Sequence, residues 1–201
     1  MKHPKLFSSA CLALLLGLSG CASTSDHGAT AVAPMDEAAM MKAMTQLATP
    51  GPEHAALAKH VGTWRTSYEH KLAPDAPWTQ SEGVTTAKMI LGGRFLYEDI
   101  TFNIPNMPPM QGVQIMGFDN LTKEYESHWM DSMSTWMIHS RGKMDSEGTL
   151  ELKGMMTDVM GTRAFRMTMK NLPDGSNFME MYDTAPGGGE VLMMKATSKR
   201  N

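Results

Sequence analysis

Polar and apolar side chains alternate along the chain from residue 64 onward. Trp64, Thr66, Tyr68 and His70 share one side of an extended segment, and the residues between them are charged or small and polar. A period of two with one polar face predicts an antiparallel strand that is covered on one side. The same pattern, interrupted by turn-forming residues, predicts ten strands in succession. These strands are expected at residues 64–72, 79–91, 94–103, 112–118, 123–131, 135–143, 149–156, 163–171, 177–183 and 190–197.

About ten consecutive strands joined by short turns predict an all-β fold class. The connections are too short for the crossovers that a parallel sheet needs, so the strands must be antiparallel. An up-and-down β-barrel and a sandwich both fit this pattern. We favour the barrel because closure removes free sheet edges. A barrel of this size also leaves room inside for a small ligand.

Two short helices are expected before the barrel. Met40, Met44 and Leu47 recur at helical spacing, which predicts a helix over residues 35–48. Two prolines and a glycine end this helix. A second, shorter helix is expected at residues 53–61 and ends where the first strand begins.

The N-terminus has the pattern of a signal peptide. Basic residues precede an apolar run, residues 12–18, that is too short to span a bilayer as a mature helix. The run ends in Leu18-Ser19-Gly20-Cys21, which resembles the lipobox of bacterial lipoproteins. This resemblance implies that Cys21 is lipidated, becomes the first mature residue and anchors the protein through its acyl chains. The alternative is an ordinary secretory signal with a chance cysteine.

No aspartate directly follows Cys21. By resemblance to Gram-negative lipoproteins, we expect a lipid-anchored protein of the bacterial cell envelope, held at the outer membrane and facing the periplasm. The membrane is then a partner through the anchor. The expected organisation is a signal peptide at 1–20, a flexible tether at 21–34, a helical segment at 35–61 and the β-barrel domain at 62–198.

Composition narrows the possible functions. The formal net charge of −3 is too small to indicate binding to nucleic acid. The two cysteines, Cys11 and Cys21, both lie in the N-terminal segment. The predicted barrel therefore has no disulfide, no zinc–thiolate site and no cysteine nucleophile. Methionine occurs 22 times, so it must take many positions that leucine and valine usually fill.

Several stretches resemble known proteins. Gly62-Thr63-Trp64, which opens the first strand after a short helix, resembles the start of lipocalin-like (calycin) barrels, in which the tryptophan plugs the barrel floor. Residues 89–96, 117–125 and 129–135 resemble a bacterial family, the domain of unknown function numbered fifteen seventy-nine. The resemblance covers roughly residues 55–198. It implies a calycin-like barrel and supplies no catalytic residues.

If the Trp64 side of the first strand faces inward, the interior is lined by aromatic and methionine side chains. Such a pocket suits a flat or flexible apolar ligand. The simpler alternative is that the methionines only fill a core. The candidate ligand-binding residues are Trp64, Tyr68, His70, Tyr125, Trp129, Asp131, Met137, His139, Phe165, Met167 and Met169.

His70, Asp131 and His139 form the best polar trio, because they could orient a ligand, hold a metal or pair with each other. A hydrolase is disfavoured because the chain has no Gly-x-Ser-x-Gly elbow. Some ten-stranded barrels that open with a similar Gly-Thr-Trp bind heme through a histidine near the C-terminus, whereas the last histidine here is His139. We therefore expect no cofactor and assign no catalytic residues.

The rival hypothesis is Cu(I) binding, because thioethers are soft ligands. Met40, Met41 and Met44 are the metal candidates, and Met107 with Met110 and Met130 with Met133 repeat the spacing of Met41 and Met44. These pairs are expected on a helix, a loop and a strand end, yet three sulfurs must converge on one ion. Exposed methionines could instead serve as an oxidation sink.

The sequence thus predicts a lipid-anchored periplasmic protein that binds or carries a small hydrophobic ligand, such as a fatty acyl chain or a quinone, without catalysis. Copper binding and a structural envelope lipoprotein with a filled barrel are the alternatives. No set of residues in the sequence indicates a particular enzyme activity, and no sequence feature identifies a protein partner.

Overall fold

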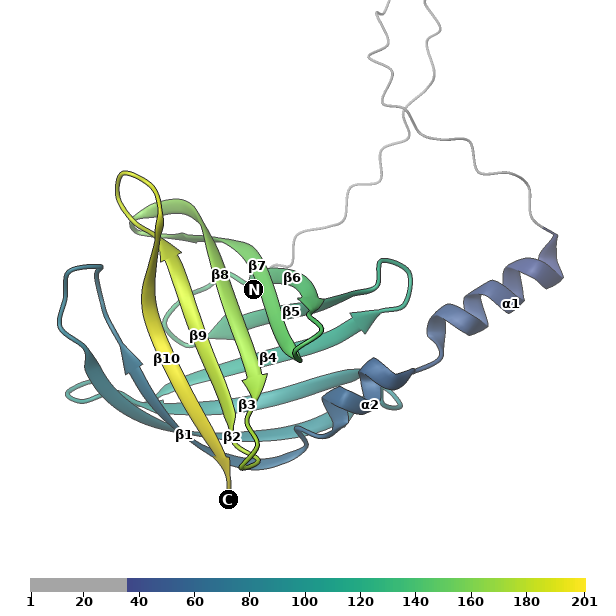
Figure 1. Ribbon diagram of the computed structural model, residues 1–201, viewed down its shortest axis with the longest axis horizontal. Coiled ribbons are helices and arrows are strands. Elements are labelled where there is room, and N and C mark those ends of the chain that lie inside the picture. The colour runs from purple at the N-terminus through teal and green to yellow at the C-terminus, as the bar shows by residue number, and fades with distance from the viewer. Residues whose placement is uncertain (1–35) are drawn as a thin grey trace, which may run out of the picture. The chain divides into compact units, whose positions relative to one another are not determined.

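The computed structural model describes residues 36–201, in which two helices precede ten strands (Figure 1). The predicted signal peptide, the tether and Cys21 lie outside the described residues. Within residues 36–201 no helix combines the length and the apolar character needed to cross a membrane. The elements are α1 (Glu37–Ala48), α2 (Pro52–Ala58), β1 (Gly62–His70), β2 (Thr79–Ile90), β3 (Phe95–Asn103), β4 (Met110–Asp119), β5 (Glu124–Asp131), β6 (Ile138–Met144), β7 (Thr149–Asp158), β8 (Gly161–Asn171), β9 (Asn177–Thr184) and β10 (Glu190–Arg200).

The ten strands form a closed antiparallel barrel in which consecutive strands are paired. The ring is completed by β1 and β10, which pair from Trp64 opposite Arg200 to His70 opposite Met194. This closure confirms the predicted up-and-down β-barrel and rules out the sandwich. Figure 1 shows the strands curving around a common interior, with the last strand lying beside the first.

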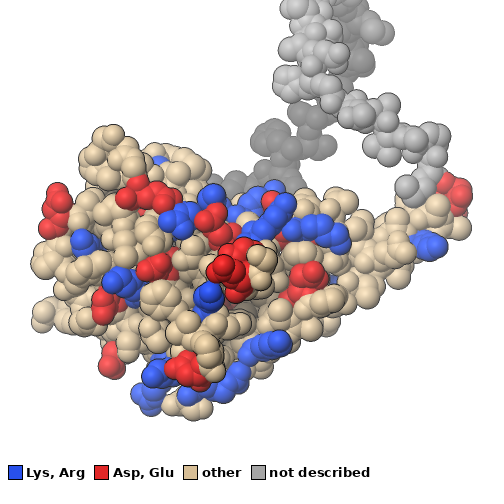
Figure 2. Space-filling view, viewed as in Figure 1, with Lys and Arg blue, Asp and Glu red and all other residues tan. Residues whose placement is uncertain are grey.

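Alternation along each strand decides which side chains enter this interior. On β1, Trp64, Tyr68 and His70 are buried, whereas Arg65 and Ser67 are exposed. The polar faces of the strands form the outer surface. Figure 2 shows basic and acidic side chains interspersed over the face turned to the viewer, so this face carries charges of both signs side by side.

Helix α2 closes one end of the barrel. Leu57 of α2 is 4% exposed and packs in the larger hydrophobic cluster with Leu96, Tyr125 and other inward side chains. The Trp64 indole N–H donates to the His60 carbonyl, 2.7 Å away. The Arg200 guanidinium lies over the Trp64 ring, 4.6 Å from its centroid. We call this the closed end.

At the opposite end, which we call the open end, no helix of residues 36–201 packs against the strands. The hydrophobic cluster at this end contains Tyr68, Ile100 and Phe102, but the methionines and Trp129 packed against that cluster are only partly buried. The loops at the open end comprise residues 71–78, 104–109, 132–137, 159–160 and 185–189.

The strand between residues 135 and 143 was predicted to begin too early. β6 starts at Ile138, and residues 132–137 form a loop. The Asp131 carboxylate accepts the Met133 N–H at 2.9 Å, and the Ser132 N–H donates to the Gln111 carbonyl at 2.8 Å. An Asp side chain that bonds the backbone two residues on makes a turn, so the chain changes direction before β6 can pair.

Candidate functional site

Strand β1 supplies three of the predicted interior residues. Trp64, Tyr68 and His70 all face inward and are buried. His70 lies toward the open end, where its Nδ1 is 3.4 Å from the Ser81 hydroxyl. Burial lowers the pKa of His70. The neutral imidazole is therefore favoured at that position.

Strand β5 supplies three more predicted residues, all on its inner face. Tyr125 is buried in the cluster at the closed end, where its ring meets Phe118 edge-on at 5.0 Å. Trp129 lies toward the open end, and its indole N–H donates to the Asp131 carboxylate at 2.8 Å. Asp131 is half-buried. The hydrogen bond from the Trp129 indole to the Asp131 carboxylate holds the Trp129 ring across the interior.

Strand β8 places Phe165, Met167 and Met169 inside, as predicted. Phe165 is buried, and the two methionines are half-buried against the larger cluster. Met179 and Met181 of β9 lie directly opposite Met169 and Met167. Together these side chains make a flexible thioether wall on one side of the interior. The sequence prediction missed Met179 and Met181, because neither face of that strand is cleanly polar.

Met137 and His139 do not line the interior, and that prediction is wrong. Met137 is 67% exposed in the loop before β6. On β6 the inward position belongs to Ser140, which is buried, so its neighbour His139 must point outward. The trio of His70, Asp131 and His139 therefore does not form. A shift of one residue in a strand transfers every side chain to the other face.

A row of polar side chains crosses the middle of the interior. Glu98 of β3 lies opposite Gln114 of β4. The Gln114 amide donates to the Ser127 hydroxyl of β5 at 2.8 Å, and Ser127 lies opposite Ser140 of β6. Apolar clusters lie on both sides of this row. We call these four residues the polar row.

Glu98 was missed at the sequence level and is the most unusual group in the barrel. Its neighbours on the same face of β3, Leu96 and Ile100, are both buried. Burial raises the pKa of Glu98 to about 7. A signal was present in the sequence, since Glu98 occupies an apolar position in the alternation of β3. A carboxyl group with this pKa carries its proton part of the time at neutral pH.

Tyr68 faces the same space as Glu98. Burial raises the pKa of Tyr68 to about 12, and the charge of Glu98 adds to the rise. The Tyr68 hydroxyl thus remains protonated at neutral pH. Its ring lies 4.6 Å from Phe102, and Phe102 lies 5.9 Å from Trp129. These three rings form an aromatic wall beside the polar row.

The interior therefore combines aromatic and thioether surfaces with two groups that can donate protons in hydrogen bonds, Tyr68 and protonated Glu98. Apolar walls with a few placed polar groups are typical of small-molecule sites. Two surface hollows lie elsewhere. A groove of about 520 Å³ lies over β7–β9 beside Arg166 and Tyr182, and one of about 280 Å³ lies beside Gln80 and Asn103.

The methionines proposed for copper do not converge. Met40, Met41 and Met44 are exposed on α1. The end of this helix is held near the closed end by Asn120, whose amide donates to the Leu47 and Thr49 carbonyls. Met107 and Met133 lie in loops of the open end. Copper binding by the α1 methionines alone remains a prediction.

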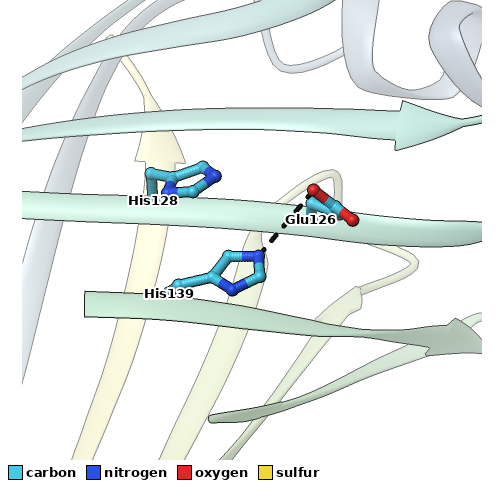
Figure 3. A group of neighbouring side chains, drawn as sticks. All are labelled: Glu126, His128 and His139. Carbon is cyan, nitrogen blue, oxygen red and sulfur yellow. Dashed lines mark ion pairs between the residues drawn. The ribbon is translucent and has the colours of Figure 1, made fainter. Parts of the chain in front are cut away.

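The described residues do contain one group of histidine and carboxylate side chains that could hold a metal. Glu126 and His128 of β5 and His139 of β6 lie together on the outer face of the barrel (Figure 3). The polar trio expected inside the barrel is thus replaced by a different trio outside it.

Residues 49–200 match the family described as "Protein of unknown function (DUF1579)". A search of curated proteins finds no match. The crystal structure of Rv2717c from M. tuberculosis is similar at 14% identity and a TM-score of 0.57, covering 76% of this chain and 99% of that chain.

The structure of the S-type phycobiliprotein lyase CPES from Guillardia theta is also similar. Its identity is 11% and its TM-score is 0.54, and the match covers 74% of this chain and 92% of that chain. At these identities the likeness of both structures shows the fold alone. It agrees with the calycin-like barrel that the sequence predicts.

Proposed function

The chain belongs to the family of proteins of unknown function DUF1579, and we propose that it binds and carries a small apolar molecule inside its barrel. The observation that supports this best is the polar row between two apolar clusters. Burial at this position raises the pKa of Glu98 to about 7. A filled structural core has no need of a carboxyl group there, because burying it without a partner costs free energy.

The hydrogen-bonding groups in the interior limit the chemical class of ligand that we expect. Tyr68 and protonated Glu98 each carry an O–H group that can donate a hydrogen bond to a ligand in the same apolar space. A carbonyl oxygen on a flat or flexible apolar body accepts such bonds, and we expect it to lie between the aromatic wall and the methionines. A quinone has this chemistry. Methionine side chains have three rotatable bonds and can repack around such a ligand.

The open end supplies the route of entry. Its loops carry exposed apolar side chains, which we call the apolar rim. Exposed apolar surface of this kind marks sites of interaction with apolar partners. The rim consists of Leu72, Met107, Met133, Trp136, Met137, Val159 and Met160.

We further propose that the protein is lipidated at Cys21 and held at the outer membrane, facing the periplasm. The lipobox-like sequence around Cys21 supports this proposal. Metabolic labelling of the expressed full chain with a fatty acid tests it. Label that is retained by the wild type and lost in Cys21→Ser is expected, whereas equal labelling of both overturns the anchor.

Native mass spectrometry of residues 22–201, purified from a periplasm, tests ligand carriage. A co-purified organic mass that disappears on denaturation supports the proposal and identifies the ligand. The empty protein is next titrated with a short-chain quinone while tryptophan fluorescence is recorded. An empty protein that takes up no quinone overturns carriage of a carbonyl ligand and favours a filled, structural barrel.

The pH dependence of quinone binding tests the role of Glu98. Protonated Glu98 donates to the carbonyl, so affinity should fall as pH rises through about 7. Glu98→Gln keeps an N–H donor and should bind with a flat pH profile. Asp99→Asn, at an exposed position next along the strand, is the matched control and should keep the wild-type profile. A flat profile in the wild type contradicts the assignment.

A further inference from the structure

The outer face of the barrel brings three potential metal ligands to one point. Glu126 and His128 are two residues apart on β5, so they share a face. Their neighbour Ser127 is buried inside, which turns both of them outward. His139 on β6 lies directly opposite His128 in the antiparallel register. Backbone pairing, which does not depend on side-chain rotamers, therefore fixes the juxtaposition.

The side chains are already close to a coordination geometry. The rings of His128 and His139 stack with centroids 4.6 Å apart and an interplanar angle of 16°. His139 Nε2 lies 3.8 Å from Glu126 Oε2. One ligand atom from each residue lies within 4.8 Å of the others, and Figure 3 shows the three side chains directed to one side of the strands.

These separations are slightly longer than a bound ion requires. Zinc binds histidine nitrogen at about 2.0–2.1 Å and carboxylate oxygen at about 2.0–2.2 Å, so its tetrahedral ligand atoms lie roughly 3.3 Å apart. Small rotations of exposed side chains close this gap. His139 is 45% exposed and Glu126 29% exposed at the side chain, so an ion reaches them from solvent.

Arg141 orients the Glu126 carboxylate through an ion pair. Its guanidinium bonds Glu126 through Oε1, while Oε2 is the oxygen that faces His139. A hydrogen-bonded second oxygen is the usual partner that orients a ligating carboxylate. Glu124 lies 3.9 Å from Arg141 and 3.8 Å from Lys143, and its charge offsets part of the positive charge beside the site.

We propose that Glu126, His128 and His139 bind one divalent transition-metal ion, of which zinc is the test case. Imidazole and carboxylate together suit zinc, copper(II) and nickel, whereas calcium and magnesium prefer oxygen ligands alone. Three protein ligands leave a fourth position on zinc for water or an external group. This site is independent of the barrel interior and of the α1 methionines.

Isothermal titration of the protein, residues 22–201 and stripped of metal with a chelator, tests the proposal with Zn²⁺. One equivalent is expected to bind. His128→Ala, His139→Ala and Glu126→Gln should each weaken binding by at least about ten-fold, a loss that even outer partners of a metal can cause. Cobalt(II) absorption should report tetrahedral coordination in the wild type and lose that signature in the histidine variants.

Two control variants test whether any loss of zinc binding is specific to the three proposed ligands. Glu82→Gln changes an exposed carboxylate on β2 and should leave zinc binding intact. The triple change of Met40, Met41 and Met44 to leucine should also leave it intact, since these residues lie on α1. Zinc binding that is unchanged in both histidine variants, or absent from the wild type, overturns the site. Circular dichroism confirms that each variant remains folded.

Discussion

Glu98 carries the largest conflict between burial and charge in the barrel interior. Burial raises its pKa from 4.5 to about 7, so the folded state holds the proton more tightly than the unfolded chain. The stability that this proton contributes is fully present below pH 4.5, declines between pH 4.5 and 7, and is lost above pH 7. The full loss is about 3 kcal/mol, since one pKa unit corresponds to about 1.4 kcal/mol.

Glu98→Gln should therefore stabilise the protein at pH 8 and leave it nearly unchanged at pH 4.5. The amide imitates the protonated carboxyl, so the free energy of unfolding should rise by up to about 3 kcal/mol at the higher pH. Urea unfolding across this pH range measures the difference. Asp99→Asn should show no comparable effect. A Glu98→Gln variant that is destabilised at pH 8 contradicts a half-buried, desolvated carboxylate without a compensating partner.

The side of the barrel wall on which a side chain lies could be predicted where polar and apolar residues alternate regularly along the strand. On β1 and β8 one face was distinct, and the residues assigned to the interior lie there. The prediction that His139 and Met137 face the interior was wrong. The strand pattern had been extended back across the loop of residues 132–137, so Met137 was counted as part of a strand. Glu98 was overlooked although it stands between Leu96 and Ile100 on the apolar face of β3, because a charged residue at one position of an alternating strand is easily taken for an exposed one.

Helix α2 closes one end of the barrel, and Leu57 and His54 are its two buried side chains. Leu57 packs against the larger hydrophobic cluster from outside the strands. Leu57→Ala should lower the free energy of unfolding by about 2–4 kcal/mol, through lost burial and the cavity left behind. Denaturant unfolding measures this. Leu47→Ala on α1 is the matched control, because Leu47 is exposed, and a comparable loss there contradicts a special role for α2.

The elements themselves were largely predictable, because turn residues separate them. Gly148 and Gly175 adopt φ values of 78° and 83°, which glycine tolerates and other residues rarely do. The loop before β6 was the exception. There the turn depends on the Asp131 side chain and on the Ser132 bond to Gln111. The second of these contacts joins parts of the chain that a sequence pattern cannot relate.

The whole barrel depends on β10, because this strand closes the ring. Deleting residues 190–201 leaves β1 and β9 with unpaired edges, and exposed edges promote aggregation. We expect the truncated protein to lose cooperative unfolding and to elute as aggregate in size-exclusion chromatography. A truncated form that remains monomeric and unfolds cooperatively contradicts the need for closure. At this scale the strand count alone left barrel and sandwich open, and the pairing of β1 with β10 decides between them.

The same closure sets an order for folding. Nine of the ten strand pairings join consecutive strands and form as local hairpins, whereas the tenth brings together residues as far apart as Thr66 and Ser198, which lie 132 positions apart. The entropy of closing so long a loop exceeds that of a hairpin by about 2 kcal/mol. We therefore expect the β1–β10 seam to form late in folding. If the barrel carries a ligand, as we propose, that ligand should prolong the lifetime of the folded state by holding the two ends of the chain together.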